Sequence, residues 1–195
     1  MNDSTDIQSF LNKKMFFEGF EFDRNKTVYA IGIDPDSRGS LCAVDKQGKL
    51  VGCLRFHRQY KKKIWCLFDH FEGAKILQNI MTIAIPQASV IAIEKVGARP
   101  GQGVCSMFKF GRVYGYLSGL VQATMASSGV SEDCLKFVRP QVWQASFDFK
   151  GGQKKVVRDA ARKRWPAFKW PARSSLPDTH ISDGAFIAAW AAQMV

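Results

Sequence analysis

Short continuous runs of apolar residues in the first half of the chain predict strands. The run TVYAIGID is almost wholly apolar and rich in β-forming residues, which indicates a central strand buried on both faces. The turn sequence PDSRGS follows, and SLCAVD and LVGCLRFH then predict two further strands. The segment DKQGK between them has the composition of a hairpin loop. These features predict a three-stranded antiparallel meander.

Helical spacing dominates the second half of the chain. Phe71, Ala74 and Leu77 predict a helix over about 68–85, and this helix supplies the crossover that parallel strand pairing requires before the buried strand SVIAIE. The remaining predicted elements are, in order, a long helix over about 106–126, a strand in CLKFVRP, and helices in PQVWQAS, KKVVRDAARKRW and DGAFIAAWAAQM.

Together these elements predict one α/β domain over residues 27–195. Its sheet is expected to be five-stranded and mixed, with the three-stranded antiparallel meander joined by two parallel strands and flanked by helices. Residues 1–26 show no clear periodicity and are expected to form an N-terminal extension.

The charge of the chain indicates its partners more than its fold. Its 195 residues, 46% of them hydrophobic, are enough for a full core without metal or disulfide staples. A formal net charge of +11 indicates a polyanionic partner, either a nucleic acid or an anionic membrane surface. No apolar stretch reaches the roughly 18 residues of a spanning helix, and we expect no membrane partner.

The cysteines and the first residues indicate the compartment. The chain contains no C-x-x-C pair, so its five cysteines are interpreted as reduced core thiols rather than a zinc site. The start MNDSTDIQSF is polar and acidic, unlike a signal peptide. We therefore expect a cytoplasmic protein.

Three acidic residues stand where a metal-dependent nuclease would need them. Asp34 ends the first strand, Glu94 ends the strand SVIAIE, and Asp183 opens the last helix. An apolar strand that ends on a carboxylate is unusual, because a buried charge is costly unless it is paired or holds a metal. Two parallel neighbouring strands would bring Asp34 and Glu94 to the same edge of the sheet.

A fourth site residue is less certain from the pattern alone. His180 precedes Asp183 by three residues and would share a helical face with it, which makes His180 the preferred candidate and Asp178 its rival. Asp36 lies close to Asp34 and is interpreted as part of the turn.

Four segments of the chain resemble the RuvC-type Holliday junction resolvases of the RNase H-like superfamily, especially their short phage and bacterial members. These segments are, in order, IGIDPDSRGS, AIEKVGARPGQG, SMFKFGRVYGYLSGL and HISDGAFIAAW. The resemblance covers about residues 28–195. It implies an RNase H-like nuclease domain and a crossover junction endodeoxyribonuclease that cuts four-way DNA by paired symmetric nicks.

The resemblance also implies the active site and its cofactor. Asp34, Glu94, Asp183 and His180 would be both the catalytic residues and the metal ligands, with Asp34 as the expected bridging ligand. The cofactor would be Mg²⁺, two ions per active site, with Mn²⁺ able to substitute. Two such ions about 4 Å apart serve both the attacking water and the leaving oxygen of an in-line displacement.

Basic side chains are the candidate DNA contacts, although a solvated helix face is the simpler interpretation of any one cluster. They lie in two clusters, RQYKKK and KKVVRDAARKR, in the loop GARPGQG and in the long helix. The predicted contacts are Lys61, Arg99, Arg112, Lys154, Lys155 and Arg158. Trp143 stands where related chains often have a lysine, and its role is left open.

Gly111, Gly115 and Gly119 form a smooth stripe along the long helix. Glycine destabilises a helix by up to about 1 kcal/mol relative to alanine, so another backbone is expected to approach closely. That backbone belongs either to the sheet of the same subunit or, as the resemblance implies, to a second subunit of a homodimer.

Three other functions compete with junction resolution. An RNase H-like nuclease could act on other branched DNA or on RNA-containing structures. The segment IGIDPDSRGS also resembles the phosphate loop of actin-like ATPases, which need a second domain that 195 residues scarcely allow. A non-catalytic nucleic-acid-binding module would have no reason to retain carboxylates that repel DNA.

Overall fold

The structure is a computed structural model. It describes residues 21–22, 27–36, 38–60, 63–66, 71–95, 97, 101–150, 154–170 and 177–195. In these parts of the chain, no helix combines the length and apolar character needed to cross a membrane.

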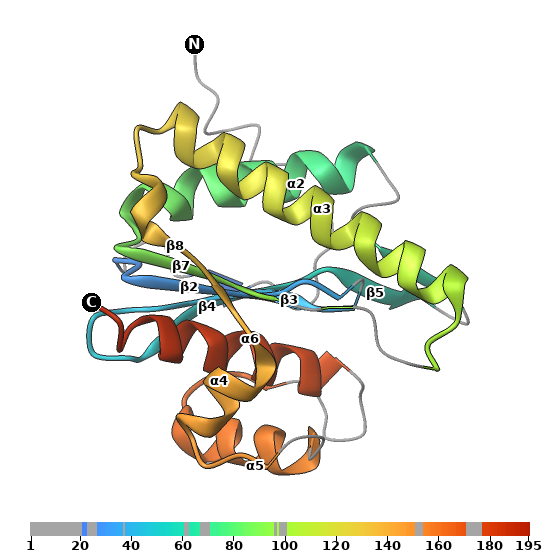
Figure 1. Ribbon diagram of the computed structural model, residues 1–195. Coiled ribbons are helices and arrows are strands. Elements are labelled where there is room, and N and C mark those ends of the chain that lie inside the picture. Colours follow the sequence, from blue (N-terminus) through green and yellow to red (C-terminus); the bar gives the residue numbers. More distant parts are fainter. Residues whose placement is uncertain are drawn as a thin grey trace.

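A mixed sheet forms the middle layer of the molecule (Figure 1). Its strand order is β1-β4-β3-β2-β7-β8. The strands are β1 (Glu21–Phe22), β2 (Ala30–Asp34), β3 (Ser40–Val44), β4 (Leu50–Arg55), β7 (Val90–Glu94) and β8 (Leu135–Val138). Strands β2, β3 and β4 form the predicted antiparallel meander, and β2, β7 and β8 pair in parallel as predicted. The two-residue β1 adds an edge strand beside β4, from within the predicted extension.

A second, two-stranded sheet was not predicted. It consists of β5 (His57–Tyr60) and β6 (Lys63–Cys66), which pair antiparallel. The prediction placed the whole of LVGCLRFH in one strand, but β4 ends at Arg55. The pattern missed the hairpin because each strand has only four residues and the first, HRQY, is mostly polar.

Helices cover both faces of the main sheet. Helices α2 (Phe71–Ala84) and α3 (Val104–Ser127) lie on one face, and α6 (Pro177–Ala191) lies on the other (Figure 1). Helices α4 (Pro140–Ala145) and α5 (Lys154–Arg164) lie beyond α6, away from the sheet. Two short 3₁₀ helices, η2 (Ile85–Gln87) and η3 (Glu132–Cys134), precede β7 and β8.

Side-chain size differs between the two faces of the central strands. Because side chains alternate along a strand, Ile31 and Ile33 of β2 pack in the core beneath α2 and α3. Ala30 packs in the opposite core with α6, and Gly32 also faces that helix. A Cβ atom at Gly32 would overlap the backbone of α6 at Ala188. The small residues therefore allow the backbone of α6 to lie directly on the sheet.

The same close contact recurs one strand further along. A Cβ atom at Gly184 of α6 would overlap Ser40 Oγ of β3 and lie 3.2 Å from Cys42 Sγ. Ser40 Oγ donates a 2.8 Å hydrogen bond to the carbonyl oxygen of His180, and Cys42 Sγ donates to that of Ile181 at 3.5 Å. These contacts fix the first turns of α6 beside the carboxyl end of β2.

The cysteines are only partly core thiols. Cys42 and Cys53 are buried on the facing strands β3 and β4. Cys105 is free and exposed in the first turn of α3, so the prediction of a core position is wrong for it, and Cys134 is half-buried. The apolar neighbours of Cys105 in the sequence do not place it in the core, because the amino-terminal end of α3 extends into solvent.

Candidate active site

Asp34 lies at the carboxyl end of β2 and is held by the turn that follows. Its side chain is 8% exposed. The backbone N–H of Asp36 donates to Asp34 Oδ1 at 3.3 Å, and Asp36 Oδ1 in turn accepts from the N–H of Arg38 at 2.9 Å. A Cβ atom at Gly39 would overlap the carbonyl oxygen of Asp34, so the turn requires glycine there. Asp36 therefore has the turn role that the sequence predicted.

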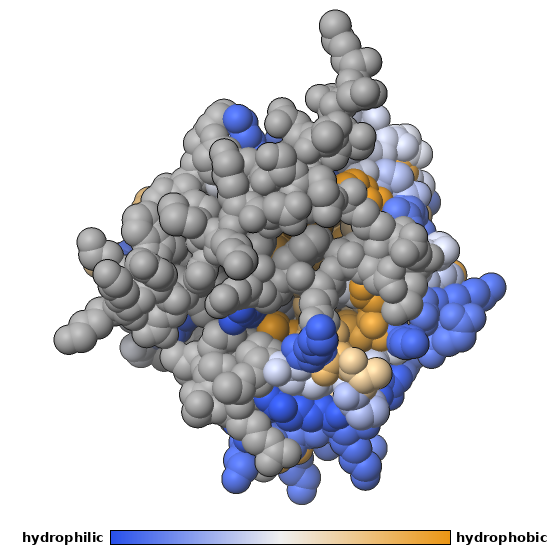
Figure 2. Space-filling model, turned by 180° about the vertical axis from the view of Figure 1, so that it is seen from behind, coloured by the Kyte–Doolittle hydropathy of each residue, from blue (hydrophilic) through white to orange (hydrophobic). Residues whose placement is uncertain are grey.

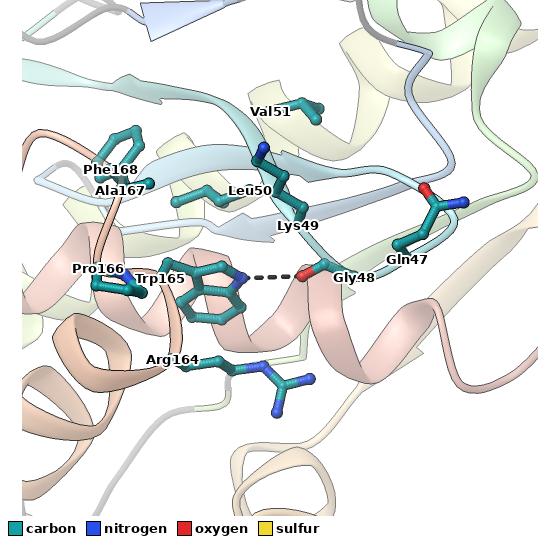
Figure 3. A pocket seen from close by; sticks show the side chains of 10 residues that line it. All are labelled: Gln47, Gly48, Lys49, Leu50, Val51, Arg164, Trp165, Pro166, Ala167 and Phe168. Carbon is teal, nitrogen blue, oxygen red and sulfur yellow. Dashed lines mark hydrogen bonds between the residues drawn. The ribbon is translucent and has the colours of Figure 1, made fainter.

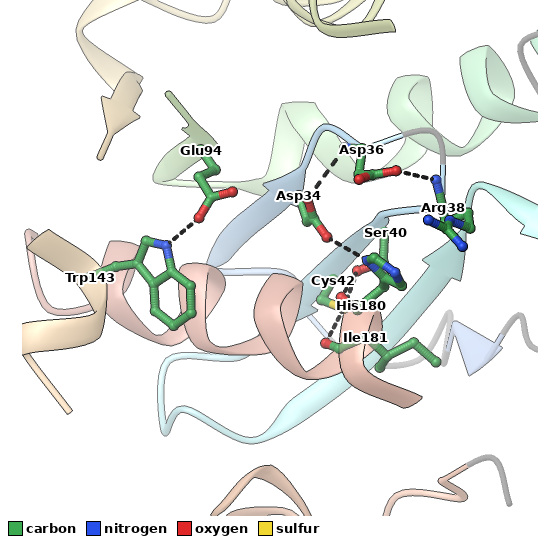
Figure 4. Close-up of polar contacts among 9 residues, drawn as sticks. All are labelled: Asp34, Asp36, Arg38, Ser40, Cys42, Glu94, Trp143, His180 and Ile181. Carbon is green, nitrogen blue, oxygen red and sulfur yellow. Dashed lines mark hydrogen bonds and ion pairs between the residues drawn. The ribbon is translucent and has the colours of Figure 1, made fainter. Parts of the chain in front are cut away.

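His180 lies in the first turns of α6 and contacts Asp34. Its Nδ1 atom is 3.2 Å from Asp34 Oδ2, and the His180 side chain is buried (Figure 4). An ionised carboxylate only accepts hydrogen bonds, so Nδ1 carries the proton in this contact when Asp34 is ionised. The rival candidate, Asp178, lies in the same helix, but its side chain is outside the described residues.

Asp183 is in electrostatic contact with the carboxylates of both strand ends. Burial is the largest cause that raises its pKa well above the ordinary aspartate value, and the charges of Asp34 and Glu94 raise the pKa further. The charge of Lys154 lowers it. Three acidic groups from β2, β7 and α6 therefore share one electrostatic environment, with a lysine of α5 nearby.

Glu94, at the end of β7, contacts a residue that the sequence did not assign. Trp143 of α4 is fully buried, and its Nε1 atom donates a 2.8 Å hydrogen bond to Glu94 Oε1 (Figure 4). The strand register, which the sequence alone does not give, explains this contact. Glu94 pairs with Val138 of β8, and Trp143 follows only five residues later in the chain.

The carboxylates of Asp34, Glu94 and Asp183 are chemically suited to bind a divalent cation, but their side chains are not arranged around one common point. Within the described residues, no group of three or more His, Cys, Asp or Glu side chains is arranged to hold a metal ion. In this conformation Asp34 is paired with His180, and Glu94 is hydrogen-bonded to Trp143. Carboxylate oxygens are the ligands that Mg²⁺ prefers, and a cation would relieve the mutual repulsion that Asp183 experiences. The residue types therefore fit Mg²⁺.

The predicted DNA contacts fall in different places. Lys154 and Lys155 are exposed at the start of α5, and hydrophilic residues gather over the end of the molecule where this helix lies (Figure 2). Arg158 is half-buried, and its Nε and Nη2 atoms each lie 3.1 Å from Asp159 Oδ1. Arg112 is exposed on α3. The remaining two predictions, Arg99 and Lys61, lie outside the described residues.

The glycine stripe of α3 does not pack on its own sheet. Cβ atoms at Gly111, Gly115 and Gly119 would meet no described atom within 4 Å. The helix turns Val113 and Leu117 towards the core instead. The interpretation that the stripe contacts the sheet of the same subunit is therefore wrong, because the glycines lie on the opposite face of α3.

A cavity of about 630 Å³ lies elsewhere, between the β3–β4 turn and the end of α5 (Figure 3). Trp165 forms part of its wall and donates from Nε1 to the carbonyl oxygen of Gly48 at 2.9 Å. Among the described residues, those that line this cavity are uncharged or basic, and Asp34, Glu94, His180 and Asp183 are not among them. Because metal chemistry needs the carboxylates, we place the candidate site at Asp34, Glu94 and Asp183.

Comparisons with known proteins support the fold. No protein-family model and no curated protein sequence matches the chain. Among solved structures, the chain is similar to RuvC of T. thermophilus in complex with a Holliday junction substrate, with a TM-score of 0.53 and 14% identity over 82% of this chain and 89% of that one. It is also similar to another structure of Thermus thermophilus RuvC, with a TM-score of 0.51 and 18% identity over 82% and 90% of the two chains. The predicted RNase H-like fold is thus confirmed.

Proposed function

We propose that the chain is a Mg²⁺-dependent endonuclease that resolves four-way DNA junctions by paired symmetric nicks. The observation that carries this proposal is the convergence of three carboxylates: Asp34 and Glu94 end the paired parallel strands β2 and β7, and both are close enough to Asp183 of α6 to add to the rise in its pKa that burial causes. Buried carboxylates that repel one another are typical of sites that bind cations, because a bound cation offsets the repulsion. The RuvC fold, which in one solved structure is in complex with a Holliday junction substrate, supports the choice of substrate.

In this proposal Asp34, Glu94 and Asp183 hold Mg²⁺. When bound, the ions activate the attacking water and neutralise the leaving oxygen, and Mn²⁺ can replace them. His180 is the fourth site residue, in preference to Asp178, because its Nδ1–H can hold one oxygen of Asp34. The rotation of Asp34 is thereby restricted, and its Oδ1 atom is restrained by the N–H of Asp36.

Lys154 has a place in the proposed DNA interface. Its charge acts on Asp183 although its side chain is exposed, so it lies at the margin between the acidic site and solvent. A phosphate that approached the carboxylates would meet this ammonium group. Lys155 and Arg158 extend the same basic helix, and Arg112, Arg99 and Lys61 complete the proposed contacts.

The proposed assembly is a homodimer. Two identical strands of a four-way junction are cut at symmetric places, which suits a two-fold assembly of identical subunits. The exposed glycine stripe of α3 supports this arrangement, because it leaves a surface that another backbone could approach closely.

A cleavage assay tests the proposal. The protein is incubated with labelled four-way DNA, forked DNA, linear duplex and an RNA–DNA hybrid, with Mg²⁺ or with EDTA. We expect ligatable nicks at symmetric positions in the four-way substrate only, and only with Mg²⁺. Asp34→Asn and Glu94→Gln should abolish cleavage and preserve junction binding, because each removes a metal ligand and a negative charge near phosphate.

Two results would contradict the proposal. Cleavage of the forked or hybrid substrate in preference to the four-way junction would favour the broader RNase H-like activity. Full cleavage by Asp34→Asn would exclude this carboxylate from the chemistry.

A further inference from the structure

The hydrogen bond between Trp143 and Glu94 is different in kind from the indole hydrogen bonds of Trp165 and Trp170. Trp165 and Trp170 donate from their indole nitrogens to backbone carbonyl oxygens, at 2.9 and 3.0 Å. Trp143 donates to a carboxylate oxygen at 2.8 Å. Hydrogen bonds to an ionised acceptor are shorter and about twice as strong as neutral ones, so this contact restrains Glu94 firmly.

The surroundings of Trp143 hold its ring in place. The side chain is fully buried in the core that contains α6, and it meets Phe149 in a T-shaped contact with 6.5 Å between the ring centroids. An indole in such surroundings has little freedom to turn. Its N–H group is therefore a fixed donor at the end of β7.

We infer that Trp143 is a positioning residue that holds Oε1 of Glu94 and so directs Oε2 towards the metal. This inference rests on the proposed function. One carboxylate oxygen can accept the indole N–H while the other binds a cation. Partners that orient metal ligands in this way typically change metal affinity by roughly 10- to 100-fold when they are removed. Trp143 thus acts through Glu94 and does not itself contact substrate.

The test compares Trp143→Phe with a matched control. Phenylalanine keeps an aromatic ring in the core and removes the N–H donor. Trp165→Phe removes an indole hydrogen bond of similar length from a similarly buried tryptophan, but this bond goes to the backbone at Gly48, away from the carboxylates. Mg²⁺ binding to each purified protein is measured by calorimetry, without DNA, and folding is checked by circular dichroism.

We expect Mg²⁺ affinity to fall by roughly tenfold in Trp143→Phe and to stay unchanged in Trp165→Phe. Wild-type binding that Trp143→Phe leaves unchanged, or makes tighter, would overturn the inference and leave the proposed function intact. A wild-type protein that takes up no Mg²⁺ would overturn the proposed function, and the inference with it.

A measurement on the wild-type protein covers the case in which Trp143→Phe does not fold. Each indole N–H gives a separate proton–nitrogen correlation in NMR spectra. The signal of Trp143 is the one that Glu94→Gln displaces most, because that variant removes the charge of the acceptor. We expect this signal to move on Mg²⁺ addition. Saturation with Mg²⁺ that leaves it in place would contradict a metal-linked role for Trp143.

Discussion

Asp183 is expected to make the stability of the folded protein depend on pH. Its pKa is raised in the folded protein, so the folded state binds a proton more tightly than the unfolded state. The stability that this proton contributes is present at low pH. It is lost as pH rises from the unfolded aspartate value, about 3.9, through the raised value in the folded protein. Above that range the metal-free protein carries a destabilising charge.

A pH series of thermal melts in EDTA should therefore show stability falling across this range. Asp183→Asn should flatten that fall, because asparagine does not titrate. Added Mg²⁺ should raise the melting temperature of the wild type most at the upper end of the range, where Asp183 is ionised and free to bind. Equal pH dependence in the wild type and in Asp183→Asn would show that another group is responsible.

The residues of the site differ in how far the sequence predicted them. Asp34 and Glu94 were predictable because each is a carboxylate at the end of an apolar strand, and such a charge needs a reason. Trp143 was not, because its role depends on the register that places α4 beside the end of β7.

At the scale of the elements, the close packing of α6 on the sheet places His180 and Asp183 beside the end of β2. Gly32→Ala should lower the free energy of unfolding by roughly 1–3 kcal/mol, because the new methyl group meets the backbone of α6, which must shift. The matched control is Gly97→Ala, outside the glycine stripe, where an added Cβ meets no described atom and the backbone is not left-handed, so stability should rise by up to about 1 kcal/mol. Chemical denaturation measures both. Equal stabilities of the two variants would contradict direct contact between α6 and β2.

The exposed face of α3 tests the proposed dimer. Gly115→Leu places a large side chain in the glycine stripe, where the monomer has open space. The fold should survive while the dimer dissociates, and sedimentation velocity at matched concentrations separates these effects. A dimer that persists in Gly115→Leu would place the interface elsewhere.

The elements themselves were mostly predictable. Apolar runs and helical spacing fixed the meander, the parallel strands and the main helices, because burial imposes those periods on the sequence. The β5–β6 hairpin was missed, since its strands, HRQY and KIWC, have only four residues each and are too short to show a clear alternation. The sequence pattern also could not predict which way the glycine stripe faces, because all sides of α3 carry small or apolar residues.

The net charge of the whole molecule predicts how strongly the proposed DNA binding depends on salt concentration. Each phosphate contact adds roughly 0.9 to the slope of log affinity against log salt concentration. Lys155→Ala should therefore weaken junction binding uniformly across sequences and reduce the slope by about that amount. Binding titrations between low and moderate salt measure it. An unchanged slope would exclude Lys155 from the interface.

In the proposed function, carboxylates from β2, β7 and α6 form one divalent-metal centre. Diffraction from crystals soaked in Mn²⁺, collected at a wavelength where manganese scatters anomalously, locates the ions. We expect two anomalous peaks among Asp34, Glu94 and Asp183, with Asp34 between them. Peaks that lie away from these three side chains, in a protein that is saturated with Mn²⁺, would contradict it.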